Sequence, residues 1–347
     1  MIQTNRIKNL SKMITSENLE AFVITFIPDL TYLCGVAMEG YWMVISRNRY
    51  WIITNKLLDG AFVDLGVPSE RLLVKMNFKE LLEGLIQKYG WTKVGFDGEG
   101  TPYSLGKFFE EKGYVNCPKF LASLRVSKDK EEISAVRRAC QITAKTMDFI
   151  SKKLKPGLKE SEMALMIEYH MRTQGADKIG FDPIVGSGPN SAVPHHRTGD
   201  RKIKAEDTVV IDIGCVWKNY CSDMTRTFYV GKKPSDLFRK VHSIVAEAQT
   251  AGVQKIQNGL AGRDVDLACR SVVEREGMGE LFTHGTGHGV GIEIHEPPWI
   301  RSKSENVIGP GMIITVEPGI YLDGRLGVRI EDTVLVTAKG AEILTKP

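Results

Sequence analysis

The sequence predicts two domains of different class, an α/β domain over residues 1–124 and an α+β domain over residues 125–347. Three observations support this division. The chain has 347 residues, which is long for a single hydrophobic core. Strand-like and helix-like patterns alternate over about the first 120 residues. From residue 181 onward the pattern changes to hairpins, glycines and clustered acidic residues.

The first domain is predicted to contain a mostly parallel sheet, because its short apolar segments alternate with helical patterns. Residues 78–89 have apolar side chains at the spacing of an amphipathic helix. No phosphate-binding loop, glycine fingerprint or acidic cluster occurs in this part of the chain, so we expect no catalytic group from it. The segments with the pattern of strands are residues 21–26, 41–46, 50–54, 71–76 and 93–98.

Two amphipathic helices are predicted at the start of the second domain, over residues 125–154 and 159–174. Ser127, followed by Glu131 and Glu132, has the pattern of a helix N-cap. We place the domain boundary at the start of this helix. Its apolar face consists of residues 133, 136, 140, 143, 147 and 150.

Composition argues against several classes of protein. With 42% hydrophobic and 25% charged residues the chain resembles an ordinary globular protein. The net charge of +4 is small and dispersed, which disfavours nucleic-acid and membrane partners. The first 20 residues do not have the pattern of a signal peptide, and no apolar run approaches the ~18 residues of a membrane span. The six cysteines form no C-x-x-C pair, so we expect free thiols, Cys215 and Cys221 included, in a cytoplasmic protein.

Three of the seven histidines fall within residues 284–296, HGTGHGVGIEIHE. His284 and His288 have the spacing of two metal ligands on one helix face. Each interleaved glycine, however, costs a helix about 1 kcal/mol relative to alanine. We therefore expect a glycine-rich turn or bent strand. The alternative is that the glycines only permit tight packing and the histidines bond locally, but three imidazoles in so short a stretch favour a functional site.

Residues 208–230 are predicted to form two strands around a turn at Lys218 and Asn219. A two-residue turn pairs residue 212 with 225 and 214 with 223, which places Asp212 and Asp223 as diagonal neighbours on one face. Either aspartate alone has a turn or capping role as its alternative. Two carboxylates on one face repel each other unless one is protonated or a cation lies between them, so the pair favours a bound cation.

Two further apolar segments, residues 312–322 and 326–336, are predicted to be strands that carry acidic residues. Glu317 lies in the first segment, and Arg329, Glu331 and Asp332 lie in the second. A charge inside an apolar strand is costly unless it is paired or metal-bound. The alternative is a solvated edge strand, which we accept for Asp332 but not for Glu317 and Glu331 together.

This set of two aspartates, two glutamates and clustered histidines suits two divalent ions. Carboxylates can bridge two ions, and a neutral imidazole can complete a coordination shell. A thiolate zinc site is disfavoured because the cysteines are not paired in sequence. Two ions about 3.5–4 Å apart hold a shared hydroxide and polarise a carbonyl or phosphoryl oxygen. The residues therefore predict a dinuclear metallohydrolase.

At these residues the chain resembles the pita-bread metallopeptidase family, which includes prolidase, aminopeptidase P, methionine aminopeptidase and creatinase. About the first 120 residues resemble the creatinase-like N-terminal domain of prolidase and aminopeptidase P in pattern only. The resemblance implies an α/β N-terminal domain and an α+β pita-bread catalytic domain. It is carried by six segments in order: SGPNSAVPHH, IDIG, YCSDMTRT, HGTGHGVGIEIHE, TVEPGIY and GVRIED.

The resemblance also implies roles for individual residues. It implies two divalent metal ions per chain, with manganese preferred and cobalt, zinc or iron also compatible. Asp223 and Glu331 would bridge them, and Glu317 would accept a proton. The full set of implied ligands is Asp212, Asp223, His288, Glu317 and Glu331.

Around the metals, His195 and His295 would contact the substrate and stabilise the tetrahedral intermediate. His284 would line the proline pocket, and Arg329 would orient Glu331 and the substrate. The neighbouring His196 has no implied role, and a surface position is expected for it.

The implied function is hydrolysis of the bond between an N-terminal residue and proline. We expect an Xaa-Pro dipeptidase, with an Xaa-Pro aminopeptidase acting on longer peptides as the alternative. The large N-terminal domain disfavours methionine aminopeptidase, and the complete ligand set disfavours creatinase-type enzymes and a metal-free binding protein. A homodimer is expected, formed at least partly through the N-terminal domain.

A free proline carboxylate calls for a fixed guanidinium, which binds a carboxylate through two hydrogen bonds. Some prolidase-like relatives have H-E-x-P-R, with an arginine four residues after the histidine that matches His295. Here HEPPWIRSK places Trp299 at that position. Arg301 reaches the same face if the segment is extended. The alternative is that Trp299 forms an apolar wall for a longer substrate or closes the pocket by packing.

Overall fold

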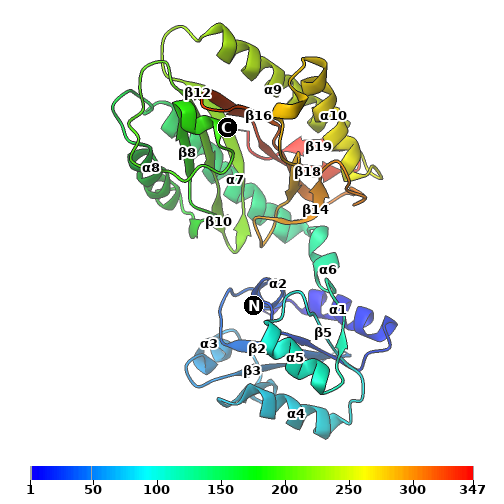
Figure 1. The fold of residues 1–347 in the computed structure, drawn as a ribbon. Helices are drawn as coiled ribbons and strands as arrows, with labels where there is room; N and C mark the ends of the chain where they lie inside the picture. Colours follow the sequence, from blue (N-terminus) through cyan, green and yellow to red (C-terminus); the bar gives the residue numbers. More distant parts are fainter. Residues whose placement is uncertain (1, 48, 347) are drawn as a thin grey trace. The chain divides into compact units, whose positions relative to one another are not determined.

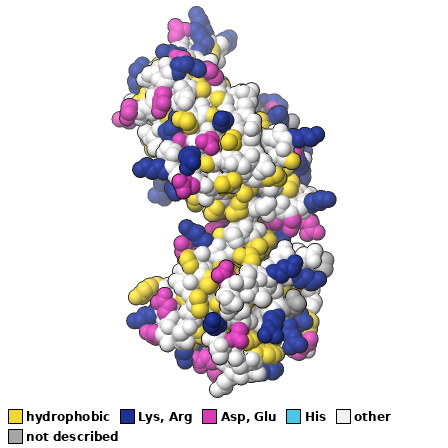
Figure 2. All heavy atoms as spheres, turned by 90° about the vertical axis from the view of Figure 1, so that its right-hand side faces the viewer, with side chains coloured by type: hydrophobic (Ala, Val, Ile, Leu, Met, Phe, Trp, Pro, Cys, Tyr) yellow, Lys and Arg dark blue, Asp and Glu magenta, His cyan; other side chains and the backbone are white. Residues whose placement is uncertain are grey.

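The computed structural model describes residues 2–47 and 49–346, and the chain divides into two compact units, Met1–Arg125 and Val126–Pro347 (Figure 1). In the described residues, no helix is both long enough and apolar enough to cross a membrane. On the face drawn in Figure 2, cationic and anionic side chains are interspersed over both units. That face therefore presents no field of a single sign.

The first unit is built on a mixed six-stranded sheet in the order β4-β3-β2-β1-β5-β6. Three of its five strand pairs are parallel (β3–β4, β1–β5 and β5–β6), whereas β1–β2 and β2–β3 are antiparallel. The antiparallel pair β2–β3 arises because the connection is too short for a crossover. The strands are β1 (Ala21–Ile24), β2 (Tyr41–Ser46), β3 (Arg49–Thr54), β4 (Leu72–Val74), β5 (Val94–Phe96) and β6 (Val115–Asn116).

Helices pack onto this sheet through apolar faces. Helix α4 occupies Phe78–Tyr89, as its periodicity predicts, and the Asn77 side chain caps it by accepting from the Glu80 N–H. Leu82 and Leu85 of α4 enter the same buried cluster as Phe109. The remaining helices are α1 (Thr4–Ser16), α2 (Ile27–Cys34), α3 (Asp59–Asp64), η1 (Ser69–Arg71), α5 (Tyr103–Glu111) and α6 (Ala122–Val126).

The second unit begins with helices α7 (Lys130–Ser151) and α8 (Glu160–Thr173), at the two predicted places. The predicted cap at Ser127 is wrong. Asp129 caps α7 instead, because its carboxylate accepts from the Glu131 and Glu132 N–H groups, each at 2.9 Å. Ser127 donates its hydroxyl to Pro310 O at 3.0 Å.

The strands of the second unit lie between two pairs of helices. Figure 1 shows α8 on one side of the strands, with α9 (Asp236–Lys255) and α10 (Gly262–Arg275) on the other. Apolar residues of α7 and α8 pack on the sheet β12-β9-β8, and those of α9 and α10 pack on β15 to β18. The remaining elements are β7 (Lys178–Ile179), β8 (Ile184–Ser187), η2 (Gly188–Ala192), β9 (Thr208–Ile213), β10 (Cys215–Trp217), β11 (Tyr220–Cys221), β12 (Met224–Tyr229), η3 (Gly279–Leu281), β13 (Gly287–Gly289), β14 (Glu296–Ile300), β15 (Ile313–Val316), β16 (Gly319–Leu322), β17 (Leu326–Arg329), β18 (Asp332–Thr337) and β19 (Gly340–Ile343).

The register predicted for the hairpin over residues 208–230 is confirmed. Trp217 pairs with Tyr220 around Lys218 and Asn219, which take φ of 49° and 70°. Asp212 pairs with Thr225. Asp212 therefore lies on the face of β9 opposite to its apolar neighbours Ile211 and Ile213, which enter the core beneath α7 and α8.

The two acidic segments near the C-terminus are each interrupted, so the prediction of two continuous strands is wrong. β15 ends at Val316 before Glu317, and β17 ends at Arg329 before the gap that contains Glu331. Pro318 has no N–H and cannot continue a ladder, and the Glu331 N–H bonds to Thr225 O at 3.1 Å. Each glutamate therefore lies in a gap between strands rather than inside one.

The prediction of a solvated edge position for Asp332 is also wrong. β18 lies between β15 and β19, and Asp332 is 7% exposed. Its carboxylate accepts from Arg226 Nη2 at 2.7 Å and from Gln249 Nε2 at 2.9 Å. The charge is tolerated in the interior because it is paired.

Candidate metal centre

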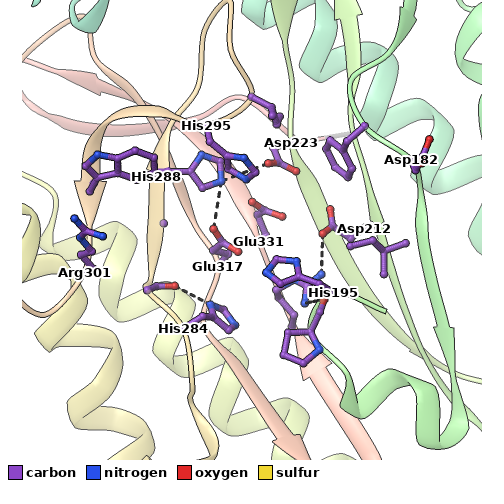
Figure 3. A pocket seen from close by; sticks show the side chains of 18 residues that line it. Asp182, His195, Asp212, Asp223, His284, His288, His295, Arg301, Glu317 and Glu331 are labelled. Carbon is purple, nitrogen blue, oxygen red and sulfur yellow. Dashed lines mark hydrogen bonds and ion pairs between the residues drawn. The ribbon is translucent and has the colours of Figure 1, made fainter. Parts of the chain in front are cut away.

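A pocket of about 440 Å³ in the second unit contains every residue that the sequence singles out as a site residue (Figure 3). Figure 3 shows the carboxylates of Asp223, Glu317 and Glu331 gathered at its centre, with Asp212 facing them. The predicted site residues among its lining are His195, Asp212, Asp223, His284, His288, His295, Trp299, Arg301, Glu317, Arg329 and Glu331.

Backbone and hydroxyl contacts aim the two glutamates. The Glu317 N–H bonds to Thr286 O at 2.8 Å, and the Glu331 N–H bonds to Thr225 O. The Thr225 hydroxyl also donates to Glu331 Oε2 at 2.7 Å. Glu331 is thus held by a residue of β12, and Glu317 by the residue that precedes β13.

His288 presents one ring nitrogen to the carboxylates. Its Nδ1 lies 3.0 Å from Gly289 O, and because a carbonyl oxygen only accepts, Nδ1 carries the proton. The lone pair of Nε2 then faces Asp223 Oδ2 at 3.6 Å and Glu317 Oε1 at 3.4 Å. This is the tautomer that binds a metal ion through Nε2.

The contacts of Gly287 and Gly289 explain why the segment over residues 284–296 is rich in glycine. A Cβ at Gly287 would lie 2.1 Å from Thr315 O, and one at Gly289 would lie 2.3 Å from Pro297 O. The predicted bent strand is confirmed as β13. The missing side chains permit close approach of the strands on both sides of His288, rather than of a ligand.

The donor set fits divalent metal ions. Asp223, His288 and Glu331 each offer a ligand atom, and these atoms lie within 4.8 Å of one another. In the described structure, Asp212 Oδ1 and Asp223 Oδ1 are buried without a hydrogen-bond partner. A buried carboxylate oxygen without a partner is costly, and a cation removes that cost.

The raised pKa values of the acidic residues also indicate a bound cation. Burial, followed by the negative charge of Glu331, raises the pKa of Asp223 well above its usual value of 3.8. Burial and the Glu317 charge likewise raise the pKa of Glu331. Burial raises the pKa of Glu317 to about 8, with a further contribution from Asp212 and opposition from Arg329. Without a cation, these groups resist simultaneous ionisation.

Arg329 contacts Asp212 rather than Glu331. Its Nη2 donates to Asp212 Oδ2 at 2.7 Å, while Nε donates to the Thr225 hydroxyl at 3.1 Å. The implied orientation of Glu331 by Arg329 is therefore indirect and passes through Thr225. Burial acts to lower the pKa of Arg329, but the interactions with Tyr321 and Asp212 raise it well above its usual value.

His284 uses both of its ring nitrogens in contacts with the protein. Nδ1 lies 2.8 Å from Gly285 O, and Nε2 lies 2.9 Å from the Tyr321 hydroxyl, which also accepts from Arg329 Nη1 at 2.8 Å. Burial and the positive charge of Arg329 lower the pKa of His284 to about 4. The neutral ring therefore presents its carbon atoms to the pocket as a wall.

His195 and His295 are the exposed histidines of the pocket. Burial and the charge of His195 lower the pKa of His295. The prediction of a surface position for His196 is wrong. Its side chain is 15% exposed, and its Nε2 lies 2.9 Å from Oε2 of the fully buried Glu160.

Trp299 and Arg301 both line the pocket. The chain is extended up to Ile300, where β14 ends, and in an extended segment residues two apart lie on the same face. The Arg301 guanidinium lies 5.7 Å from the Trp299 ring centroid, within the range of a cation–π contact. Arg301 is exposed and is thus accessible to an anionic group in the pocket.

Three supporting residues were not found from the sequence: Thr225, Tyr321 and Asp266. Asp266 of α10 accepts from the Thr286 N–H at 3.1 Å and so holds the segment between His284 and His288. Thr225 could have been found from the sequence, since the predicted hairpin register pairs it with Asp212. For Tyr321 the sequence has no local signal, because its partners His284 and Arg329 lie 37 and 8 residues away. Asp266 pairs locally with Arg270, but its contact with Thr286 spans 20 residues and has no local signal.

Two family models match the chain. Residues 134–338 match metallopeptidase family M24, and residues 6–127 match the creatinase/prolidase N-terminal domain. A Xaa-Pro dipeptidase of Pyrococcus furiosus is 43% identical over 98% of this chain and 97% of its own length.

Solved structures share both the fold and the order of the units. A Xaa-Pro dipeptidase from Bacillus anthracis superimposes with a TM-score of 0.93 at 34% identity, over 99% of this chain and 97% of that chain. An X-Pro aminopeptidase from Thermotoga maritima has a TM-score of 0.90 at 31% identity, covering 98% and 97% respectively. The predicted pita-bread catalytic domain and α/β N-terminal domain are thus confirmed, and the chain belongs to metallopeptidase family M24, in the branch that carries a creatinase/prolidase N-terminal domain.

Proposed function

We propose that this chain is an Xaa-Pro dipeptidase that uses two divalent metal ions to hydrolyse the bond between an N-terminal residue and proline. The observation that carries this proposal is the convergence of four carboxylates and one imidazole on one pocket, with two buried carboxylate oxygens that lack a partner. The relatives named Xaa-Pro dipeptidase, which cover nearly the whole chain, support the substrate class.

The ions would be held by Asp212, Asp223, His288, Glu317 and Glu331. We propose manganese, because hard carboxylate oxygens predominate in this set; cobalt, zinc and iron fit it as well. When bound, two such ions lower the pKa of a shared water and polarise the scissile carbonyl.

The chain's own residues supply the remaining chemistry. His195 and His295 place exposed imidazoles at the pocket surface, where an N–H can donate to the oxyanion of the tetrahedral intermediate. We propose Glu317 as the proton acceptor, because its carboxylate lines the pocket beside Asp223, Glu331 and His288. Arg329 balances the charge of Asp212 through their hydrogen bond.

Recognition of a dipeptide requires a group for the proline carboxylate. We propose Arg301 for this role, with Trp299 beneath its guanidinium and the neutral His284 ring as an apolar wall for proline. The alternative is an Xaa-Pro aminopeptidase, in which Trp299 would contact a longer peptide.

The test combines metal analysis with two substrates. The chelated protein should not hydrolyse Ala-Pro, and activity should return with a divalent transition metal at two ions per chain. Full turnover by the metal-free protein would overturn the mechanism. A higher kcat/KM for Ala-Pro-Ala than for Ala-Pro would favour the aminopeptidase, and a purified chain that binds no metal would indicate a binding protein.

We also propose a homodimer that uses the first unit, and a cytoplasmic location. Leu57, Met76 and Tyr103 of that unit are 89%, 81% and 85% exposed, as apolar residues of an interface are in a separated subunit. All six cysteines are free thiols, which suits a reducing compartment. Light scattering at micromolar concentration tests the dimer, and a monomeric mass contradicts it.

A further inference from the structure

The segment from Ser187 to His196 carries His195 to the pocket, and a single buried carboxylate contacts it near both ends. That carboxylate belongs to Glu160, the first residue of α8, which is fully buried. At the first end, Oε1 accepts from the Ser187 N–H and from the Ser187 hydroxyl, each at 2.7 Å. Asn190 Nδ2 donates to the same oxygen at 3.0 Å.

At the other end, Glu160 Oε2 accepts from His196 Nε2 at 2.9 Å. The Glu160 carboxylate therefore closes the segment into a loop. Arg201 extends the contacts, because its Nη1 donates to the Ser187 hydroxyl at 2.5 Å and forms an ion pair with Asp207 at 2.6 Å.

His195 lies between two anchored neighbours. On one side, Pro194 O accepts from Arg329 Nη1 at 3.1 Å. On the other side, the His196 ring is held by Glu160. The backbone of His195 is thus restrained from both directions, whereas its own side chain is exposed in the pocket.

We propose that Glu160 and His196 are positioning residues that fix His195 in the geometry needed to contact the substrate; the catalytic part of this inference rests on the proposed function. A fully buried carboxylate is expensive, and an apolar side chain of similar size would pack there at lower cost. The Glu160 carboxylate instead defines the conformation of the loop, because it accepts five hydrogen bonds from the segment.

His196→Ala tests the proposal without emptying the buried site, since Glu160 keeps its contacts with Ser187 and Asn190. We expect kcat for Ala-Pro to fall about 10- to 100-fold, which is the effect of a small displacement of a catalytic group. KM and the metal content should change little. His196→Gln should recover most of the lost kcat, because its amide can donate to Glu160.

His170→Ala is the matched control. His170 is also a half-buried histidine bonded to a side chain, with Nδ1 2.9 Å from the Thr146 hydroxyl, but it does not line the pocket. This variant should retain the kcat of the unmodified protein. If His196→Ala and His170→Ala have equal kcat, the proposal is overturned.

A double-mutant cycle separates positioning from general stability. If His196 acts through His195, then His196→Ala should change kcat by less than about twofold in a His195→Ala background. An equal fold-loss in both backgrounds would indicate a general structural role and reject the proposal.

Hydrogen exchange gives a measurement that does not depend on peptidase activity. The amides of residues 187–196 should exchange faster in His196→Ala than in the unmodified protein or His170→Ala, and unchanged exchange would reject the positioning role. If the unmodified protein does not hydrolyse Ala-Pro, the proposed function fails while this measurement still decides whether His196 holds the loop.

Discussion

Asp223 shows why the acidic residues of the pocket lower the stability of the protein when no cation is bound. Its carboxylate is buried, one oxygen lacks a hydrogen-bond partner, and nearby carboxylates raise its pKa. Each of these features disfavours the folded protein when no cation is present. The same features favour tight binding of a cation, because its charge removes all three penalties at once.

Asp223→Asn should therefore have opposite effects with and without metal. The chelated variant should be more stable than the chelated unmodified protein, because one repelling charge is gone. Its metal affinity and its activity should fall more than about 100-fold, beyond the range for residues that only surround ligands. Thermal denaturation with and without chelator, together with metal analysis, measures both effects.

Asp207→Asn is the control for this substitution. Asp207 pairs with Arg201 away from the pocket, so its loss should destabilise the chelated and the metal-loaded protein alike. A chelated Asp223→Asn protein that is also less stable would show that repulsion at Asp223 is not relieved.

Arg301→Ala tests recognition of the proline carboxylate. Loss of a charge-assisted contact worth about 1.5–3 kcal/mol should raise KM for Ala-Pro by about 10- to 100-fold. KM for Ala-Pro-Ala should stay unchanged, because its proline carboxyl group is part of a peptide bond. The exposed Lys303, which does not line the pocket, provides a charge-matched control as Lys303→Ala. Equal losses on both substrates would remove Arg301 from this role.

At the scale of elements, the ends of strands place the side chains that we propose to be catalytic. Glu317 and Glu331 lie where strands are interrupted, and His295 directly precedes β14. The first residue of β14, Glu296, forms a buried ion pair with Lys128, whose Nζ lies 2.7 Å from Glu296 Oε1. The two side chains are 1% and 2% exposed, so the start of α7 and the start of β14 are joined in the interior.

Lys128→Met should lower the free energy of unfolding of the second unit by about 3–5 kcal/mol, because it leaves the Glu296 charge buried and unpaired. Adding Glu296→Leu should restore much of this loss, since two apolar residues replace the pair. Thermal denaturation of the single and double variants measures the difference. A double variant less stable than Lys128→Met would contradict this account of the pair.

Elements with a strong local pattern could be predicted from the sequence, whereas the ends of the two acidic strands could not. The pattern of α4 determined its bounds, and the turn at Lys218 determined the register that pairs Asp212 with Thr225. The breaks at Glu317 and Glu331 were missed. They depend on which residue accepts each backbone N–H, and that residue is 31 positions away for Glu317 and 106 for Glu331.

At the scale of the whole molecule, the acidic pocket makes stability depend on pH and on metal. The carboxyl groups of Asp223, Glu317 and Glu331 have raised pKa values, so they bind protons more tightly in the folded protein. Their favourable contribution is present at low pH and is lost as pH rises through their folded pKa values. His284 and His288 have lowered pKa values, about 4 and about 3, so their contribution makes the protein more stable as pH rises. This contribution stops changing above 6.5, the usual pKa of histidine.

Between pH 6.5 and about 8, the two histidines no longer affect how the free energy of unfolding depends on pH. Only the three carboxyl groups do, and Glu317 titrates at the upper end of this range. The chelated protein should lose stability across this range, on the order of 1 kcal/mol or more. Bound metal should abolish the loss, because the carboxylates are then ionised at every pH in the range. Melting temperatures at several pH values, with chelator and with metal, test this; a chelated protein that becomes more stable toward pH 8 would refute it.

The sequence by itself determined the classes of the two parts of the chain, the chemistry of the pocket and the family. The domain classes and the acidic and imidazole character of the pocket follow from local information: periodicity, turn residues, and charged or imidazole side chains inside segments that are otherwise apolar or glycine-rich. The family follows from the resemblance of six ordered segments to known members. All eleven residues proposed from the sequence line one pocket, although their individual roles remain proposals.

Only the tertiary structure decided how those residues are held. It moved Glu317 and Glu331 from strand interiors into strand gaps, turned Arg329 toward Asp212, and buried His196 against Glu160. These outcomes depend on contacts between segments 31 to 117 residues apart. Because such contacts arise when separate elements pack around a common core, no local pattern in the sequence records them.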